Sequence, residues 1–194
     1  MERELVKISV RELVEFILRS GDLDNRAGGK KDAESMIAGA RIHRKIQKSM
    51  GSDYHAEVTL KHLIAMEKFD LQIEGRADGI IDGNPVTIDE IKGIYKSLEY
   101  LKEPLPVHLA QAKCYAYIYA IQNEKSDMEV QMTYVNLDTE QKVYFREHYT
   151  IEELSDWFQN IVVEYKKWAE FRYKWKHLRN ASIKEVQFPY EYRE

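Results

Sequence analysis

Two acidic residues and one lysine lie close together in the segment IEGRADGIIDGNPVTIDEIKG, which otherwise has the composition of buried strands. Side chains alternate between the two faces of a strand, and each residue advances the strand by about 3.3 Å. Glu90 and Lys92 should therefore share a face, about 6 to 7 Å apart, while Asp89 points away. The turn DGNP should bring the strand that contains Asp78 back beside them.

This arrangement of charges suits a divalent cation and phosphoryl transfer. Two carboxylates on neighbouring strands can hold Mg²⁺, which prefers oxygen ligands and keeps several of its waters. A water on such a cation can become the nucleophile, and the ammonium of Lys92 could orient that water or offset phosphate charge. The same triplet of acid, apolar residue and base also occurs on the solvated face of half-exposed strands, so the triplet alone establishes nothing.

Hydrophobic periodicity and capping signals predict the elements that would position these residues. Ser9 with Glu12, and Thr150 with Glu153, have capping-box spacing, and Pro106 suits a first helical turn. The order of elements predicts an α/β sandwich around a mixed sheet. The predicted helices cover 9–21, 32–47, 106–122 and 150–179, the strands 55–66, 68–82, 86–93, 128–137 and 142–150, and a polar loop 21–31.

Four motifs resemble those of the PD-(D/E)XK nuclease superfamily, and specifically of its RecB-type branch. They lie within residues 33–137 and follow one another along the chain in the order that the family has. GRADGII looks like the G-x-x-D strand of that family, and IDEIKG looks like its (D/E)-x-K strand. QAKCY is similar to the Q-x-x-x-Y helix motif of the branch, and GARIHRKIQ to its motif with a single histidine. The resemblance implies a restriction-endonuclease-like sandwich, with a central mixed β-sheet flanked by helices.

Carried over residue by residue, the resemblance implies that Asp78 and Glu90 ligate Mg²⁺ or Mn²⁺, that Lys92 assists the attack, and that His43 is a further ligand. The neighbouring Asp89 raises the question of which acid is the ligand. The alternation of side chains favours Glu90, because only Glu90 shares a face with Lys92.

Three further residues of these motifs also have ordinary structural interpretations. A lone histidine such as His43 on a helix is more often packed or solvent-facing than a metal ligand. Gln111 and Tyr115 stand four residues apart on one helix face, where aromatic residues more often pack than bind. The resemblance implies that this pair holds the geometry of the catalytic strand and contacts the DNA backbone.

Length and composition predict a single domain over residues 1–194, with a core at about 32–149. The formal net charge is −4, so the overall charge does not attract nucleic acid or an anionic membrane. The single cysteine, Cys114, suits a reducing cytoplasm and is expected to be a small buried residue. No apolar run is long enough to cross a bilayer, so a cytoplasmic protein without membrane contact is expected.

The C-terminal part contains an aromatic stripe, Trp168, Phe171 and Trp175, within a segment rich in lysine and arginine. We expect the stripe to be core and the charges to be solvated, with a surface that tracks DNA as the second interpretation. The ending FPYEYRE, residues 188–194, looks like the junction into a DinG/XPD-type helicase, which predicts a helicase module in the same chain or complex.

The sequence therefore predicts a metal-dependent nuclease that hydrolyses phosphodiester bonds of DNA, an exonuclease of DNA repair or recombination. The alternative is a nuclease-like DNA-binding or docking module without catalysis. A small-molecule hydrolase that uses the same carboxylates is a third class, and only the resemblance disfavours it.

Overall fold

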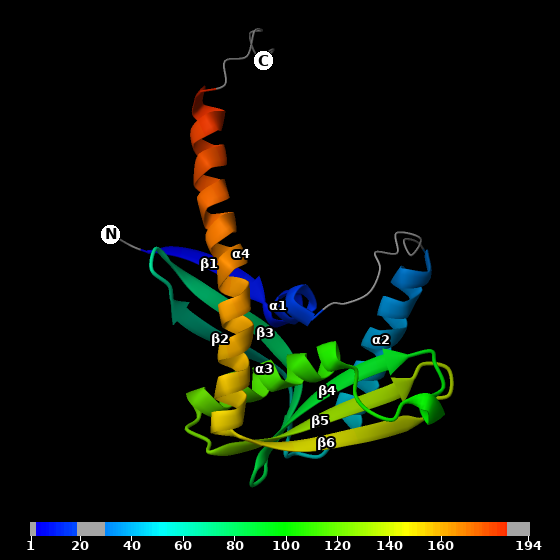
Figure 1. The fold of residues 1–194 in the computed structure, drawn as a ribbon. Coiled ribbons are helices and arrows are strands. Elements are labelled where there is room, and N and C mark those ends of the chain that lie inside the picture. Colours follow the sequence, from blue (N-terminus) through cyan, green and yellow to red (C-terminus); the bar gives the residue numbers. More distant parts are fainter. Residues whose placement is uncertain (1–2, 19–29, 186–194) are drawn as a thin grey trace.

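A six-stranded mixed β-sheet forms the centre of the computed structural model, which describes residues 3–18 and 30–185 (Figure 1). The sheet has the order β1-β3-β4-β5-β6, with β2 also paired to β3. β1 is parallel to β3 and β4 is parallel to β5, whereas the other neighbours are antiparallel. The strands are β1 (Glu4–Ser9), β2 (Tyr54–Ala65), β3 (Phe69–Ile81), β4 (Val86–Ile94), β5 (Asp127–Asn136) and β6 (Lys142–Thr150). The helices are α1 (Val10–Leu18), α2 (Lys30–Ser49), η1 (Leu98–Tyr100), α3 (Pro106–Gln122) and α4 (Ile151–Glu185).

The predicted strands and helices are confirmed where the structure describes them, and two elements, β1 and the three-residue η1, were not predicted. The expected core of 32–149 leaves out β1, although it pairs with β3 along six residues. β1 has only six residues and ends where α1 begins, and no element is predicted before the helix start at Ser9. The predicted loop at 21–31, apart from its last residues in α2, and the segment 188–194 lie outside the described residues.

Both predicted capping boxes are present. The Glu12 amide donates to Ser9 Oγ at 3.1 Å, and the Ser9 amide donates to Glu12 Oε2 at 3.2 Å. The Glu153 amide donates to Thr150 Oγ1 at 3.2 Å, and the Thr150 amide donates to Glu153 Oε2 at 2.8 Å. Each pair satisfies two amides at a helix start, so α1 and α4 begin where the sequence places them.

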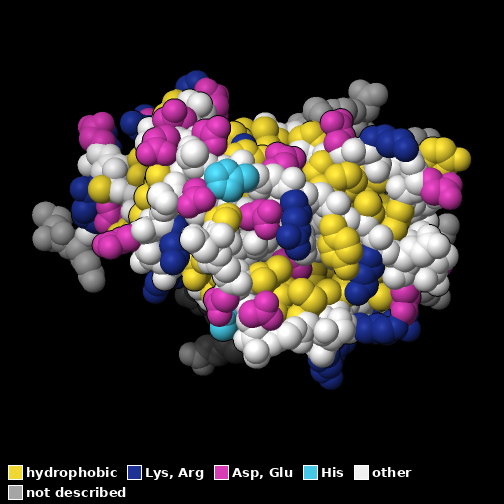
Figure 2. Space-filling view, turned by 90° about the horizontal axis from the view of Figure 1, so that it is seen from below, with side chains coloured by type: hydrophobic (Ala, Val, Ile, Leu, Met, Phe, Trp, Pro, Cys, Tyr) yellow, Lys and Arg dark blue, Asp and Glu magenta, His cyan; other side chains and the backbone are white. Residues whose placement is uncertain are grey.

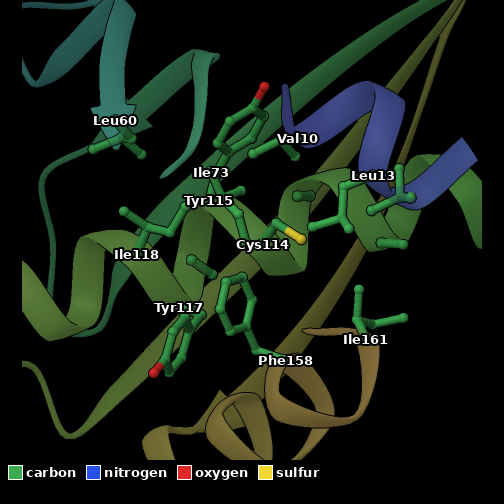
Figure 3. Close-up of a cluster of buried hydrophobic side chains, with 14 of the residues drawn as sticks. Val10, Leu13, Leu60, Ile73, Cys114, Tyr115, Tyr117, Ile118, Phe158 and Ile161 are labelled. Atoms are coloured by element: carbon green, nitrogen blue, oxygen red, sulfur yellow. The ribbon is translucent and has the colours of Figure 1, made fainter. Parts of the chain in front are cut away.

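Two hydrophobic clusters fix the helices to opposite faces of the sheet. The larger cluster joins α1, α3 and α4 to one face, through side chains such as Leu13, Cys114 and Phe158 (Figure 3). Cys114 is fully buried there, as expected. The smaller cluster packs Ile42 and Ile46 of α2 against Ile91 of β4. Alternate residues of β4 therefore face different helices, which places α2 and α3 on either side of the motif strand.

The expectation that the aromatic stripe of α4 belongs to the core is wrong. Trp168, Phe171 and Trp175 are 39%, 53% and 56% exposed. The buried residues of α4 lie mainly in its first half and end at Ala169. Beyond that point the helix extends past most of the sheet (Figure 1), and its contacts with the sheet, such as the stacking of Tyr173 on Phe69, lie on the face opposite the stripe.

The described helices include no membrane span, and the face shown in Figure 2 does not separate acidic from basic side chains. Within the described residues, no helix has the length and apolar character needed to cross a bilayer. On the face seen in Figure 2, acidic and basic side chains are intermixed. A polyanion would therefore have to bind at a local arrangement of cations.

The capping box of α4 is testable by a small change at Thr150. Thr150→Ala removes the hydroxyl that accepts the Glu153 amide, and should lower the free energy of unfolding by about 1 kcal/mol. Urea denaturation measures this loss. Thr150→Ser keeps the hydroxyl and should retain nearly all of the stability; an equal loss in both variants would contradict the cap.

Candidate active site

The site lies where β3 changes partners. Along one edge β3 pairs with β1 over residues 69–74 and with β4 over residues 79–81, so Gly75 to Asp78 face no strand on that edge. The ladder with β2 also skips Asp78 and its opposite residue Glu57. Glu57 has a φ of 61°, in the left-handed region that non-glycine residues rarely occupy. Such irregular backbone is common at functional sites.

Two hydrogen bonds that involve side chains take the place of the missing ladder bonds at Asp78. Its Oδ2 accepts the backbone N–H of Ile91 at 2.8 Å, which joins β3 to β4 at the point where their ladder ends. Its backbone carbonyl accepts Gln47 Nε2 of α2 at 2.9 Å. Asp78 is therefore held from two sides, and its Oδ1 faces His43.

The carboxylate of Glu90 is buried, and one of its two oxygens has a polar partner among the described residues. Its Oε1 lies 2.7 Å from Lys92 Nζ, and the same ammonium donates to Gln111 Oε1 at 2.6 Å. Its Oε2 is buried and has no hydrogen-bond partner among the described residues. Burial raises the pKa of Glu90 to about 7, against the opposing charge of Lys92 and with a further increase from Asp78. A buried carboxylate oxygen without a partner is costly unless a cation or donor binds it.

Asp89 points to the opposite face, as the alternation predicted. Its Oδ1 accepts Thr133 Oγ1 at 2.5 Å and Gln131 Nε2 at 3.0 Å, and its Oδ2 accepts Tyr54 Oη at 3.1 Å. Burial raises the pKa of Asp89, although all three donors oppose that change. Asp89 is thus engaged inside the protein, and Glu90 is the acid on the side of Lys92.

His43 of α2 reaches the same point, with Nδ1 3.3 Å from Asp78 Oδ1. Burial lowers the pKa of His43, but the hydrogen bond and charge of Asp78, together with the charge of Glu90, raise it more. The net pKa lies above that of an ordinary histidine. The imidazole therefore lies in the negative field of the two acids, where it could pair with Asp78 or bind a cation beside it.

Gln111 and Tyr115 approach the site from α3. Gln111 is buried and holds Lys92. Tyr115 is also buried, and a Cβ added to Gly75 would lie 2.6 Å from its hydroxyl oxygen. The glycine is needed because α3 and β3 approach so closely. The structure thus places both motif residues against β3 and β4; a contact with DNA stays a prediction.

A cleft of about 990 Å³ lies beside the residues described above. Asp78, Lys92, His43 and Gln111 line it, together with four residues that sequence reasoning missed: Arg11, Arg44, Arg76 and His108. Burial, Lys92 and Arg11 lower the pKa of His108 to about 4, so His108 is neutral near pH 7. No local spacing identifies these four residues, because α1, α2, β3 and α3 form one wall only after folding.

The residues at the site fit a divalent cation in kind. Asp78, Glu90 and His43 offer oxygen and nitrogen ligands, and Glu90 Oε2 is a buried oxygen with no hydrogen-bond partner among the described residues. As they stand, no three His, Cys, Asp or Glu side chains within the described ranges form a ready ligand cluster. Asp78 and Glu90 instead use oxygens on a backbone amide, a histidine and a lysine.

Comparisons with known proteins place the fold. No protein-family model and no curated protein sequence matches the chain. Among solved structures, SSO0001 has a TM-score of 0.53 at 20% identity, covering 81% of this chain and 75% of that one. The alkaline exonuclease LHK-Exo of Laribacter hongkongensis has a TM-score of 0.51 at 12% identity, covering 93% and 95%. LHK-Exo in complex with dAMP has a TM-score of 0.52 at 11% identity, covering 91% and 94%. The expected restriction-endonuclease-like α/β fold is confirmed.

The buried carboxylate of Glu90 predicts a pH dependence of stability. Its native pKa of about 7 exceeds the ordinary glutamate pKa of 4.5, so between these values the native state holds a proton that the unfolded state releases. The free energy of unfolding should fall as pH rises from about 4.5 to 7, and this contribution should level off above. Urea denaturation in EDTA should show a shallower fall for Glu90→Gln. If the free energy of unfolding falls equally with pH in wild type and in Glu90→Gln, the raised pKa of Glu90 is refuted.

Proposed function

We propose that the protein is a Mg²⁺- or Mn²⁺-dependent nuclease that hydrolyses phosphodiester bonds of DNA. The observation that carries this proposal is the buried Oε2 of Glu90, which has no hydrogen-bond partner among the described residues and lies beside Lys92; Lys92 and the Asp78–His43 pair line the open cleft. Asp78 and Glu90 would hold the cation, with His43 as a further ligand. When bound, such a cation supplies an activated water and offsets charge on the phosphoryl oxygens.

Lys92 is the residue of this group best placed to act on the substrate. Its ammonium lines the cleft and is held by Glu90 and Gln111, so its position is fixed before substrate arrives. A cation whose position is fixed in advance stabilises charge that develops on a phosphoryl group more than a mobile cation does. Lys92 would orient the attacking water or offset that charge.

The arginines of the cleft would bind the DNA backbone. Arg11 is 2.8 Å from Glu15 and Arg76 is 2.6 Å from Glu57, so each guanidinium is oriented by an acid on the cleft wall. Guanidinium groups suit phosphate because their donors match its geometry. The cleft therefore provides the local cations that an overall charge of −4 does not.

The exonuclease mode, a role in DNA repair or recombination, and membership of the RecB-type branch belong to the same proposal. Two structural neighbours are an alkaline exonuclease and its complex with dAMP, which supports exonuclease action here by analogy of fold. A cytoplasmic location and a helicase module stay predictions, since residues 188–194, which suggested the helicase, lie outside the described residues.

A DNA-binding module without catalysis is the second candidate, and one observation favours it. The described acids and His43 are engaged with one another and with Lys92, with no ready cluster of three ligands. A binding module would keep the cationic cleft and lose metal-dependent cleavage. The two candidates therefore differ in what divalent metal does to DNA.

The first test is digestion of end-labelled linear DNA and of circular DNA with Mg²⁺ or Mn²⁺. We expect cleavage of the linear substrate, inhibition by EDTA, and loss of both cleavage and calorimetric Mn²⁺ binding in Glu90→Gln. Asp89→Asn is the matched control, because it removes the adjacent charge while the Tyr54 hydroxyl can turn to accept from the new amide. It should keep Mn²⁺ binding. Wild type that binds DNA but never cleaves it would favour the non-catalytic module.

The second test separates catalysis by Lys92 from simple phosphate binding. A cation that acts at the transition state lowers turnover when removed, with little change in substrate affinity. Lys92→Ala should therefore reduce the single-turnover rate by roughly 10² to 10³, the range for losing one preorganised charge. DNA affinity is measured on the same variant over a salt series. If cleavage at saturating DNA is unchanged while DNA binding is weaker, Lys92 only binds phosphate and has no catalytic role.

A further inference from the structure

The second half of α4 has one face attached to the sheet and an opposite face whose apolar side chains are exposed. Tyr173 stacks on Phe69 of β3 with ring centroids 5.1 Å apart, and His177 Nε2 lies 2.9 Å from Glu4 Oε2 of β1. These contacts hold the helix against the sheet edge as it extends past the rest of the structure (Figure 1). The opposite face carries the largest exposed apolar side chains of the helix.

Four of these side chains form a regular seam. Trp168, Phe171, Trp175 and Leu178 are 39%, 53%, 56% and 65% exposed. Their spacing of three, four and three residues places them in one line along the helix, as at the a and d positions of a coiled coil. We call these four residues the α4 seam. Exposed apolar residues are common singly, but a continuous line of them marks a surface for interaction.

The aromatic rings of the seam already stack on one another or on a neighbouring ring. Phe16 of α1 stacks on Trp168 with centroids 5.5 Å apart, Trp168 on Phe171 at 5.2 Å, and Phe171 on Trp175 at 6.5 Å. A base that stacked on these rings would have to separate them. Their outward parts, together with Leu178, instead offer the ridge of side chains that packs against another helix.

Cations border the seam on both sides. Successive helix residues are turned by about 100°, which places Lys167 and Lys174 along one border and Arg172 and Arg179 along the other. All four are exposed. Lys167 makes a long contact of 3.7 Å with Glu164, whereas Arg172, Lys174 and Arg179 form no ion pair with any residue in 3–18 or 30–185. In coiled-coil terms these are the e and g positions, which select the partner by charge.

We propose that the α4 seam docks a helix of a partner protein that has apolar residues at the same three-four spacing and acidic residues along both borders. The exposed line supplies the apolar contact, and the four cations supply charge complementarity. A second copy of this chain does not fit, because its own cations would face Lys167, Lys174, Arg172 and Arg179 in either orientation. The surface is separate from the proposed nuclease site, so its test needs no DNA cleavage.

The test uses two synthetic helical peptides with identical apolar positions, one with glutamate and one with lysine at the border positions. The full chain should bind the glutamate peptide saturably and more weakly at high salt, as measured by calorimetry, and should not bind the lysine peptide. Phe171→Ala with Trp175→Ala should weaken binding at least 10-fold, since buried aromatic anchors dominate such interfaces. Both side chains are exposed, so circular dichroism should show the fold unchanged.

A charge reversal keeps the proposal falsifiable. The variant Arg172→Glu with Lys174→Glu and Arg179→Glu should lose the glutamate peptide and gain the lysine peptide, because the borders then carry the opposite sign. Binding of neither peptide by wild type would overturn the proposal. So would tight binding of oligo(dT) that Trp175→Ala abolishes, which would make the seam a single-strand DNA surface. Self-association lost in Trp175→Ala, measured by sedimentation, would assign the seam to a second copy and also overturn it.

Discussion

The gap in the pairing of β3 is the constraint on which the candidate site depends. A buried strand normally satisfies its backbone through both neighbours, and any unpaired group must find another partner. At Asp78 the ladder with β2 is interrupted and the ladder with β4 has ended. The Asp78 carboxylate bonds the Ile91 amide, and Gln47 bonds the Asp78 carbonyl. The fold thus keeps an acidic side chain at the point where two strands separate and a cleft can open.

A second constraint is electrostatic. Glu90 is buried beside Lys92, and removal of either partner would leave the other as a poorly solvated charge. Such a pair contributes little net stability compared with apolar residues of similar size. Its unpartnered oxygen makes the arrangement less favourable still, which is expected where a site is organised for a ligand rather than for stability. The nearby Asp89 shows the contrast, because three donors satisfy it and it has no access to the cleft.

Two layers of helices turn this local arrangement into a site. α3 presses Tyr115 against Gly75 and brings Gln111 to Lys92, while α2 brings His43 and Gln47 to Asp78 from the other side. Separate hydrophobic clusters anchor the two helices, so each layer is positioned by packing and not by the polar contacts. The polar side chains can therefore remain available to a ligand while the scaffold stays rigid.

Much of this protein follows from local pattern, because local pattern is what alternation, capping and turn residues encode. The strands that carry Asp78 and Glu90, the opposite orientations of Asp89 and Glu90, and both capping boxes could be predicted without a structure. The exposure of Trp168, Phe171 and Trp175 could not, since a stripe of apolar residues looks the same whether or not a layer lies beside it. β1, the role of Gln47 at Asp78, and the entry of Arg11 and His108 into the cleft were also inaccessible, because each depends on contacts between segments far apart in the chain. Sequence determined which residues could do chemistry and which side of a strand they occupy; the tertiary structure decided which of them meet, because burial and strand pairing are properties of the assembled layers.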